Sequence, residues 1–80
     1  MYHTIEFGED LVVALEISAR RWLERIRIRR GTRLRAQIKP YVVEAEEGAV
    51  EVADLFFDDG TTTRMVPFCL FSFVDDGIAT

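Results

Sequence analysis

Residues 11–26 read LVVALEISARRWLERI, and this segment fits two secondary structures that lead to different folds. At the helical period of about 100° per residue, most of its apolar side chains fall on one face, as in an amphipathic helix. That face contains Leu11, Val12, Leu15, Ala19, Trp22, Leu23 and Ile26. Every second residue from Leu11 to Ile17 is also apolar, however, as in a half-buried strand.

The helical interpretation explains more of the segment, because Val13 and Ile17 are its main apolar outliers. Acidic residues stand at the expected helix start and arginines toward its end, where the helix dipole favours each of them. We therefore predict a helix from about Asp10 to Ile26. The alternative is a strand from Leu11 to Ile17, followed by a short helix that Ser18 caps.

Residues 25–39, RIRIRRGTRLRAQIK, place arginine and apolar residues at alternate positions, which is strand periodicity. We expect an odd loop at Arg30, Gly31 and Thr32 to join two strands, with Gly31 supplying a positive φ. In that hairpin Ile28 opposes Leu34 and Arg29 opposes Arg33, so one face is apolar and the other is cationic. The predicted cationic face consists of Arg27, Arg29, Arg33, Arg35 and Lys39.

Turn residues and apolar positions in residues 40–67 predict two further hairpins. Pro40 shifts the alternation, so we expect a bulge or a sheet edge there. A two-residue turn at Glu47-Gly48 places Val43 opposite Val52 in the first hairpin. An odd loop at Asp58, Asp59 and Gly60 defines the second hairpin. Its expected pairs are Phe57 with Thr61, Val52 with Val66, and Asp54 with Arg64.

The segment from Val50 to Val74 contains, in order, a strand, a tight hairpin, a second strand, a turn marked by Pro67 and a short closing strand. This order resembles the C-terminal half of an SH3-like or Tudor-like small barrel. The resemblance rests on turns and apolar positions, so it implies a partly open barrel and assigns no functional residue.

Eighty residues suffice for one small domain, and a hydrophobic content of 49% provides it with a core. We expect a single domain over residues 1–80, with residues 76–80 frayed. The predicted fold is α+β, with one amphipathic helix packed on an antiparallel sheet of four or five strands. The sheet starts with a strand from Tyr2 to Phe7, and the resemblance implies that it curls into a partly open SH3-like barrel. An all-β small barrel is the alternative.

Charge is divided unevenly along the chain. Residues 1–18 contain four acids and no Lys or Arg, a charge of -4. Residues 19–39 contain nine basic residues against one acid, a charge of +8. Residues 40–80 contain nine acids and one arginine, a charge of -8, so the three blocks sum to the net charge of -4. The basic middle block is therefore the strongest candidate for a binding surface.

The composition provides no recognisable catalytic or metal site. One histidine, His3, and one cysteine, Cys69, are too few for a zinc site and lie near opposite ends of the sequence. We expect Cys69 to be a buried, inert residue and His3 to lie at the surface or at a strand edge. The Asp-Gly loops at 58–60 and 75–77 lack a calcium-binding spacing and are typical turns. We predict no enzyme activity and no cofactor.

The arginine face needs counter-charges, because like charges on adjacent strands repel. They can come from the chain's own acids, from an acidic protein partner or second subunit, or from nucleic acid. A pI of about 4.9 disfavours nucleic acid. We predict a non-catalytic interaction module that acts through a protein partner or as a homodimer, with RNA or DNA binding through the arginines as the alternative. A lone cysteine and the lack of a long apolar run predict a cytoplasmic protein without a membrane partner.

Overall fold

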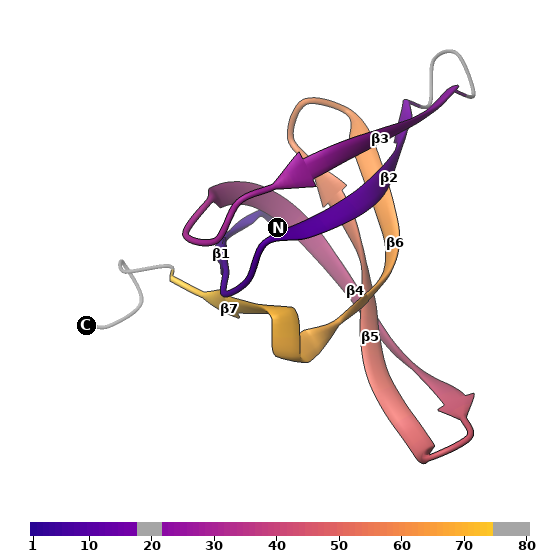
Figure 1. Cartoon of the computed structure of the whole chain (residues 1–80). Coiled ribbons are helices and arrows are strands. Elements are labelled where there is room, and N and C mark those ends of the chain that lie inside the picture. Colours follow the sequence, from indigo (N-terminus) through magenta and orange to yellow (C-terminus); the bar gives the residue numbers. More distant parts are fainter. Residues whose placement is uncertain (18–21, 75–80) are drawn as a thin grey trace.

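The computed structural model describes residues 1–17 and 22–74, with Trp22 described by its backbone alone. Seven strands in these residues form one antiparallel sheet in the order β3-β2-β6-β5-β4-β1-β7. The strands are β1 (His3–Phe7), β2 (Leu11–Ile17), β3 (Trp22–Ile28), β4 (Arg33–Ala45), β5 (Gly48–Phe57), β6 (Thr61–Pro67) and β7 (Phe71–Phe73), and the short 3-10 helix η1 (Phe68–Leu70) precedes β7. The sheet curls into a half-barrel whose edge strands are β3 and β7 (Figure 1).

The predicted helix from Asp10 to Ile26 is wrong, and the fold is all-β rather than α+β. β2 and β3 form an antiparallel hairpin that runs from the Leu11–Ile28 pair to the Ile17–Trp22 pair. Val13 is buried whereas Val12 is 60% exposed, the reverse of what the helical face requires. Strand alternation prevails because the hairpin directs Leu11, Val13 and Leu15 of β2, and Ile26 and Ile28 of β3, toward the core.

The alternative strand from Leu11 to Ile17 is confirmed by β2. The short helix proposed with it does not form over residues 22–28, which belong to β3. The capping role of Ser18 and the frayed tail at residues 76–80 concern positions outside the described residues, as does the side chain of Trp22.

The predicted hairpin between residues 25–29 and 33–39 is also wrong, because β3 pairs with β2 and β4 pairs with β1 and β5. The chain turns between them at Gly31, whose φ is +86°, and the N–H of Thr32 donates to the carbonyl of Arg29 (3.0 Å). This turn is bound to the end of β1: the N–H of Phe7 donates to the carbonyl of Thr32, and the N–H of Gly31 donates to the carbonyl of Phe7. Alternation correctly assigned the buried face of each strand but not its neighbour.

The core lies on the concave side of the half-barrel. Ile5 and Phe7 of β1 and Leu55 of β5 are its largest fully buried side chains. Ala36 and Ala53 are equally buried, and their small side chains let the strands that carry them approach the others closely. β1, which pairs with β4, thus contributes two of the three largest buried side chains to the core.

The β4–β5 hairpin turns at Glu46 and Glu47, one residue before the predicted turn, so Val43 pairs with Val50 rather than with Val52. Gly48 enters β5 with a φ of +122°, which a residue with a side chain rarely adopts. The expected sheet edge at Pro40 is confirmed, because β4 is paired with β1 up to Ala36 and continues beyond it with β5 alone among the described strands.

The β5–β6 hairpin follows the predicted register up to a bulge. Gly60 has a φ of +90°, and Leu55 pairs with Thr63 as expected. A register shift between Ala53 and Leu55 then pairs Val52 with Pro67 instead of Val66. With η1 and β7 next in the chain, the expected order of elements from Val50 to Val74 is present.

Two leucines test the assignment of the core. Leu55 is fully buried and Leu23 is 68% exposed. We expect Leu55→Ala to lower the free energy of unfolding by about 2–5 kcal/mol, because it leaves a cavity. Leu23→Ala should change it by less than about 0.5 kcal/mol. Urea denaturation measures both, and equal effects of the two substitutions would contradict the assignment.

Candidate interaction surface

The edge strand β3 carries exposed arginines that form no ion pair in the described part of the chain. Arg25 and Arg27 are exposed and lie on the convex face, opposite Ala14 and Val12 of β2. No ion pair of Arg25, Arg27 or Arg29 is found within residues 1–17 and 22–74. On its outer side β3 pairs with no other strand in the described part of the chain. Its backbone groups there are therefore open to an added strand.

The structure places the five residues of the predicted cationic face on or beside two strands, β3 and β4, that are not neighbours in the sheet. Arg27 belongs to β3 and Arg29 follows it, whereas the other three lie on β4, with β2, β6 and β5 between these strands. Arg33 Nε binds Glu6 Oε1 at 2.8 Å, and Arg35 Nη1 donates to Thr4 Oγ1 at 3.4 Å.

Lys39 pairs in the sheet with Asp54, so the β4 cations all have acidic or polar neighbours. Arg25 was missing from the predicted face. The same two-residue alternation that starts at this position could have included it.

An apolar groove runs beside the basic edge. Within the described residues β2 pairs with β6 at two positions near its end, Glu16 with Thr62 and Ile17 with Thr61. Toward the start of β2 the two strands line a groove of about 370 Å³. Exposed apolar side chains there include Val12, Leu23 and Met65, of which Met65 is 57% exposed. A ligand in this groove would contact aliphatic side chains and Arg64, whose guanidinium is bound to Glu16 and Asp54.

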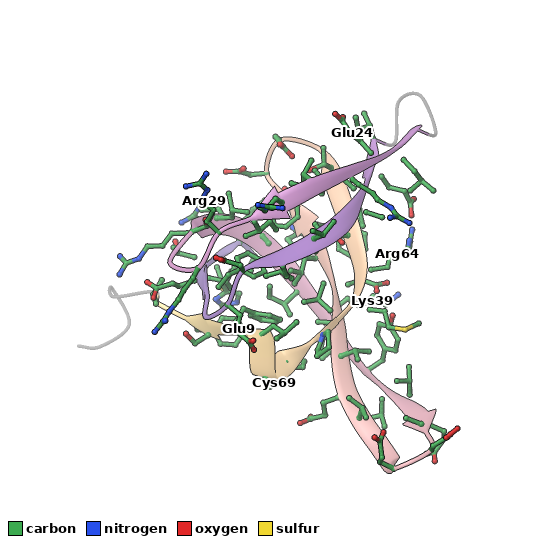
Figure 2. All side chains as sticks on the ribbon, in the orientation of Figure 1. Glu9, Glu24, Arg29, Lys39, Arg64 and Cys69 are labelled. Carbon is green, nitrogen blue, oxygen red and sulfur yellow. The ribbon has the colours of Figure 1, made fainter. Side chains whose placement is uncertain are left out.

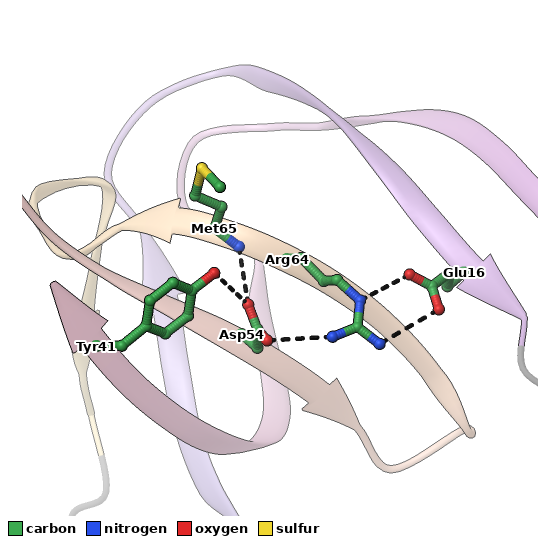
Figure 3. Close-up of polar contacts among 5 residues, drawn as sticks. All are labelled: Glu16, Tyr41, Asp54, Arg64 and Met65. Atoms are coloured by element: carbon green, nitrogen blue, oxygen red, sulfur yellow. Dashed lines mark hydrogen bonds and ion pairs between the residues drawn. The ribbon is translucent and has the colours of Figure 1, made fainter. Parts of the chain in front are cut away.

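A carboxylate cluster holds β6 at the groove (Figure 3). Asp54 Oδ1 accepts hydrogen bonds from the Tyr41 hydroxyl (2.8 Å) and the backbone N–H of Met65 (3.0 Å). Asp54 Oδ2 accepts one from Arg64 Nη1 at 3.3 Å, and Arg64 Nε binds Glu16 Oε2 at 2.8 Å. The predicted partnership of Asp54 and Arg64 is thus confirmed, although a bulge replaces their direct pairing.

The cluster shifts the pKa values of its carboxyl groups. Desolvation alone would raise the pKa of Asp54, but the Met65 N–H, the Tyr41 hydroxyl and the positive charge of Arg64 outweigh it and lower this pKa. The hydrogen bond from Arg64 lowers the pKa of Glu16. The hydrogen bond to Asp54 raises the pKa of Tyr41, because deprotonation would break this bond and place a phenolate beside a carboxylate.

The same cluster fixes an unusual backbone conformation. Met65 has a φ of +58°, in the region that favours glycine. Its N–H is held by Asp54, the residue at which the β5–β6 register shifts. A bulge of this kind bends its strand and redirects the side chains around it. It turns the exposed side chain of Met65 toward the groove.

The described residues provide no evident catalytic centre. His3 is half-buried in β1, where its ring lies 5.3 Å from that of Phe73. Since β4 and β7 flank β1, His3 is not on an edge strand. Cys69 is exposed, so its predicted burial is wrong. Groups of three potential metal ligands are not found in the described part of the chain.

No protein-family model, curated protein or solved structure gives a significant match to this chain. Over residues 1–17 and 22–74, none of the helical structure has the length and apolar character that crossing a membrane requires.

Acidification should destabilise the protein through Asp54. The unfolded carboxyl binds a proton near the ordinary pKa of 3.8, whereas the folded one, with its lowered pKa, stays ionised at lower pH. The contribution of the ionised Asp54 to the free energy of unfolding is therefore present above about pH 5, and it is lost as the pH falls through 3.8 toward the folded pKa. Urea denaturation across this range measures it. Asp54→Asn should cost about 2 kcal/mol at neutral pH and flatten the curve; a curve parallel to that of the wild type would exclude Asp54 as the cause.

The strain at Met65 predicts opposite effects for two substitutions. Met65→Gly removes a backbone cost of about 1–2 kcal/mol, partly offset by the greater freedom of glycine in the unfolded chain. We expect it to be neutral or to stabilise by up to about 1 kcal/mol. Met65→Val should destabilise by about 1 kcal/mol or more, because β-branched residues tolerate positive φ poorly. Thermal unfolding compares them, and a valine variant more stable than the glycine variant would be the contrary result.

Proposed function

We propose that the protein is a non-catalytic interaction module that binds an acidic, extended segment of a protein partner along β3. The observation that carries the proposal is the open edge of β3, with Arg25 and Arg27 exposed and without ion pairs in the described residues. A strand added at such an edge gains main-chain hydrogen bonds, while its side chains set the specificity.

The spacing of the arginines suits an extended chain. Residues two apart in a strand project on the same side about 6.8 Å from one another. Arg25 and Arg27 therefore match acidic residues at alternate positions of a partner strand. Guanidinium groups bind carboxylates with two parallel hydrogen bonds, which favours arginine over lysine at this position.

The neighbouring apolar side chains favour a polypeptide over nucleic acid. Val12 and Leu23 lie on the same face as the two arginines, and aliphatic side chains gain little from a phosphate backbone. Stacking of bases requires exposed aromatic rings near the cations. Tyr2 and Phe73, the exposed aromatic residues of the described side chains, lie at the β7 side of the sheet instead.

Cys69 supports a cytoplasmic site of action for this module. Its thiol is exposed and forms no disulfide. A reducing compartment preserves such a thiol, whereas small secreted domains usually carry paired cysteines. We therefore place the proposed interaction in the cytoplasm.

A synthetic octapeptide of alternating Glu and Val tests the proposal by fluorescence anisotropy at low salt. We expect saturable binding that the double variant Arg25→Ser with Arg27→Ser weakens about tenfold, the sum of two exposed ion pairs of about 0.7 kcal/mol each. Arg33→Ser is the matched control, because Arg33 is bound to Glu6 and should not affect the affinity. A peptide of alternating Lys and Val should not bind.

Two results would overturn the proposal. One is equal affinity of the acidic peptide for the wild type and the Arg25/Arg27 variant. The other is tighter, steeply salt-dependent binding of a single-stranded oligonucleotide of the same length, which would identify the protein as a nucleic-acid binder.

A further inference from the structure

The β4–β5 hairpin carries a second exposed cluster of like charge. Past the pair of Val52 with Pro67 it continues as a two-stranded arm, residues 42–51, which neither β1 nor β6 flanks. The arm has four acidic residues and no basic one, and all four are exposed: Glu44, Glu46, Glu47 and Glu51. None of them forms an ion pair with the rest of the described chain.

The arm has the properties of a segment that needs a partner. An isolated two-stranded ribbon is marginally stable in water. Val42 is 57% exposed on the face that it shares with Glu51, its cross-strand partner. Glu44 lies two residues further along the same face, so two acids repel one another beside an exposed aliphatic side chain.

The basic edge and the acidic arm cannot meet within one molecule. β2 and β6 separate β3 from the β4–β5 hairpin in the sheet. The arm projects from one end of the half-barrel, away from the β2–β3 hairpin (Figure 1). Arg29, at the end of β3, likewise lies far from the arm (Figure 2). Ion pairs between these two surfaces can therefore form only between molecules.

We infer that the acidic segment bound along β3 is the arm of a second copy of this chain, an inference that rests on the proposed function. The two surfaces are complementary in spacing as well as in sign. Glu44 lies on the β4 strand of the arm and Glu51 on its β5 strand, as diagonal neighbours with Cβ atoms about 7 Å apart. When the arm packs along β3, the long side chains of Arg25 and Arg27 span the two strands and reach both carboxylates.

Each surface also adds an exposed aliphatic side chain to its two charges. Val42 accompanies the glutamates and Leu23 accompanies the arginines. When the arm lies along β3, burial of these two side chains adds apolar contact to the ion pairs. Both β3 and the arm also have backbone edges without a strand partner in the described chain, so the contact can extend the sheet from one copy into the next.

The contact is head-to-tail, because it joins two different surfaces. Each bound copy still offers a free arm or a free β3 edge, and the assembly grows until the rotation between copies closes a ring. Association should weaken as salt rises, since exposed ion pairs orient the two surfaces.

Sedimentation velocity of the full chain at low salt tests the inference with two variants. The arm variant carries Glu44→Gln and Glu51→Gln, and the edge variant carries Arg25→Glu and Arg27→Glu. We expect the mass of the wild type to rise with concentration and each variant alone to associate at least tenfold more weakly. An equimolar mixture should form a 1:1 dimer and no larger species. The intact β3 edge of the arm variant binds the intact arm of the edge variant, whereas the neutralised arm and the acidic edge do not attract one another.

Glu9→Gln is the matched control, since Glu9 is exposed outside the arm and should leave association unchanged. Circular dichroism of both double variants shows whether they keep the wild-type fold. If either double variant misfolds, the single substitutions Glu51→Gln and Arg27→Glu replace it, with the same mixing rule.

Three results would overturn the inference: a wild type that stays monomeric at all accessible concentrations, folded variants that associate as the wild type does, or a mixture that stays monomeric while the wild type associates. A monomeric wild type that still binds the acidic octapeptide through Arg25 and Arg27 would refute the second copy and leave the proposed function standing. A wild type that neither associates nor binds the peptide would refute both.

Discussion

The carboxylate of Asp54 joins four strands of the half-barrel. It lies on β5, accepts hydrogen bonds from Tyr41 of β4 and from Arg64 and Met65 of β6, and reaches β2 through the ion pair between Arg64 and Glu16. These bonds hold the bulge at which β6 changes register. The bend accompanies the groove between β2 and β6, and the shifted register brings Pro67 to Val52, where the arm begins.

Local signals in the sequence predicted the strands and turns better than the sheet that they form. Alternation from residue 25 onward gave the buried faces of β3 and β4, and Asp-Gly at 59–60 gave the β5–β6 turn. The neighbours of β3 were not predictable in this way, because a strand with one apolar face can pair with any partner that shares its concave side. β1 takes the place beside β4 through Ile5 and Phe7, whose burial is decided by the whole core.

The helix error and the unforeseen bulge have separate physical causes. Over residues 11–26 the helical and strand patterns share Leu11, Leu15 and Ile26, and residues such as Val12 and Val13 distinguish them only once the burial of each is known. At the bulge, a sequence-based search for positive φ looks for glycine or asparagine, and the chain has methionine there. The signal that was available is the facing pair of Asp54 and Arg64, which the hairpin register brought together. Of the interaction surface, the sequence indicated Arg27 and Arg29 but wrongly joined them to the β4 cations.

Sheet order determines which charges stay free for a partner. The described cations of the +8 block lie mainly along β3 and β4. Those of β4 have neighbours within the molecule, with Arg33 bound to Glu6 and Lys39 beside Asp54. The β3 portion has β2 on one side and no strand of the described chain on the other. Arginines along β3 make pairing of two such edges unfavourable, and glutamates do the same for two arms. Contacts between like surfaces are thus suppressed by charge, and the contact that charge favours is the one between a basic edge and an acidic arm.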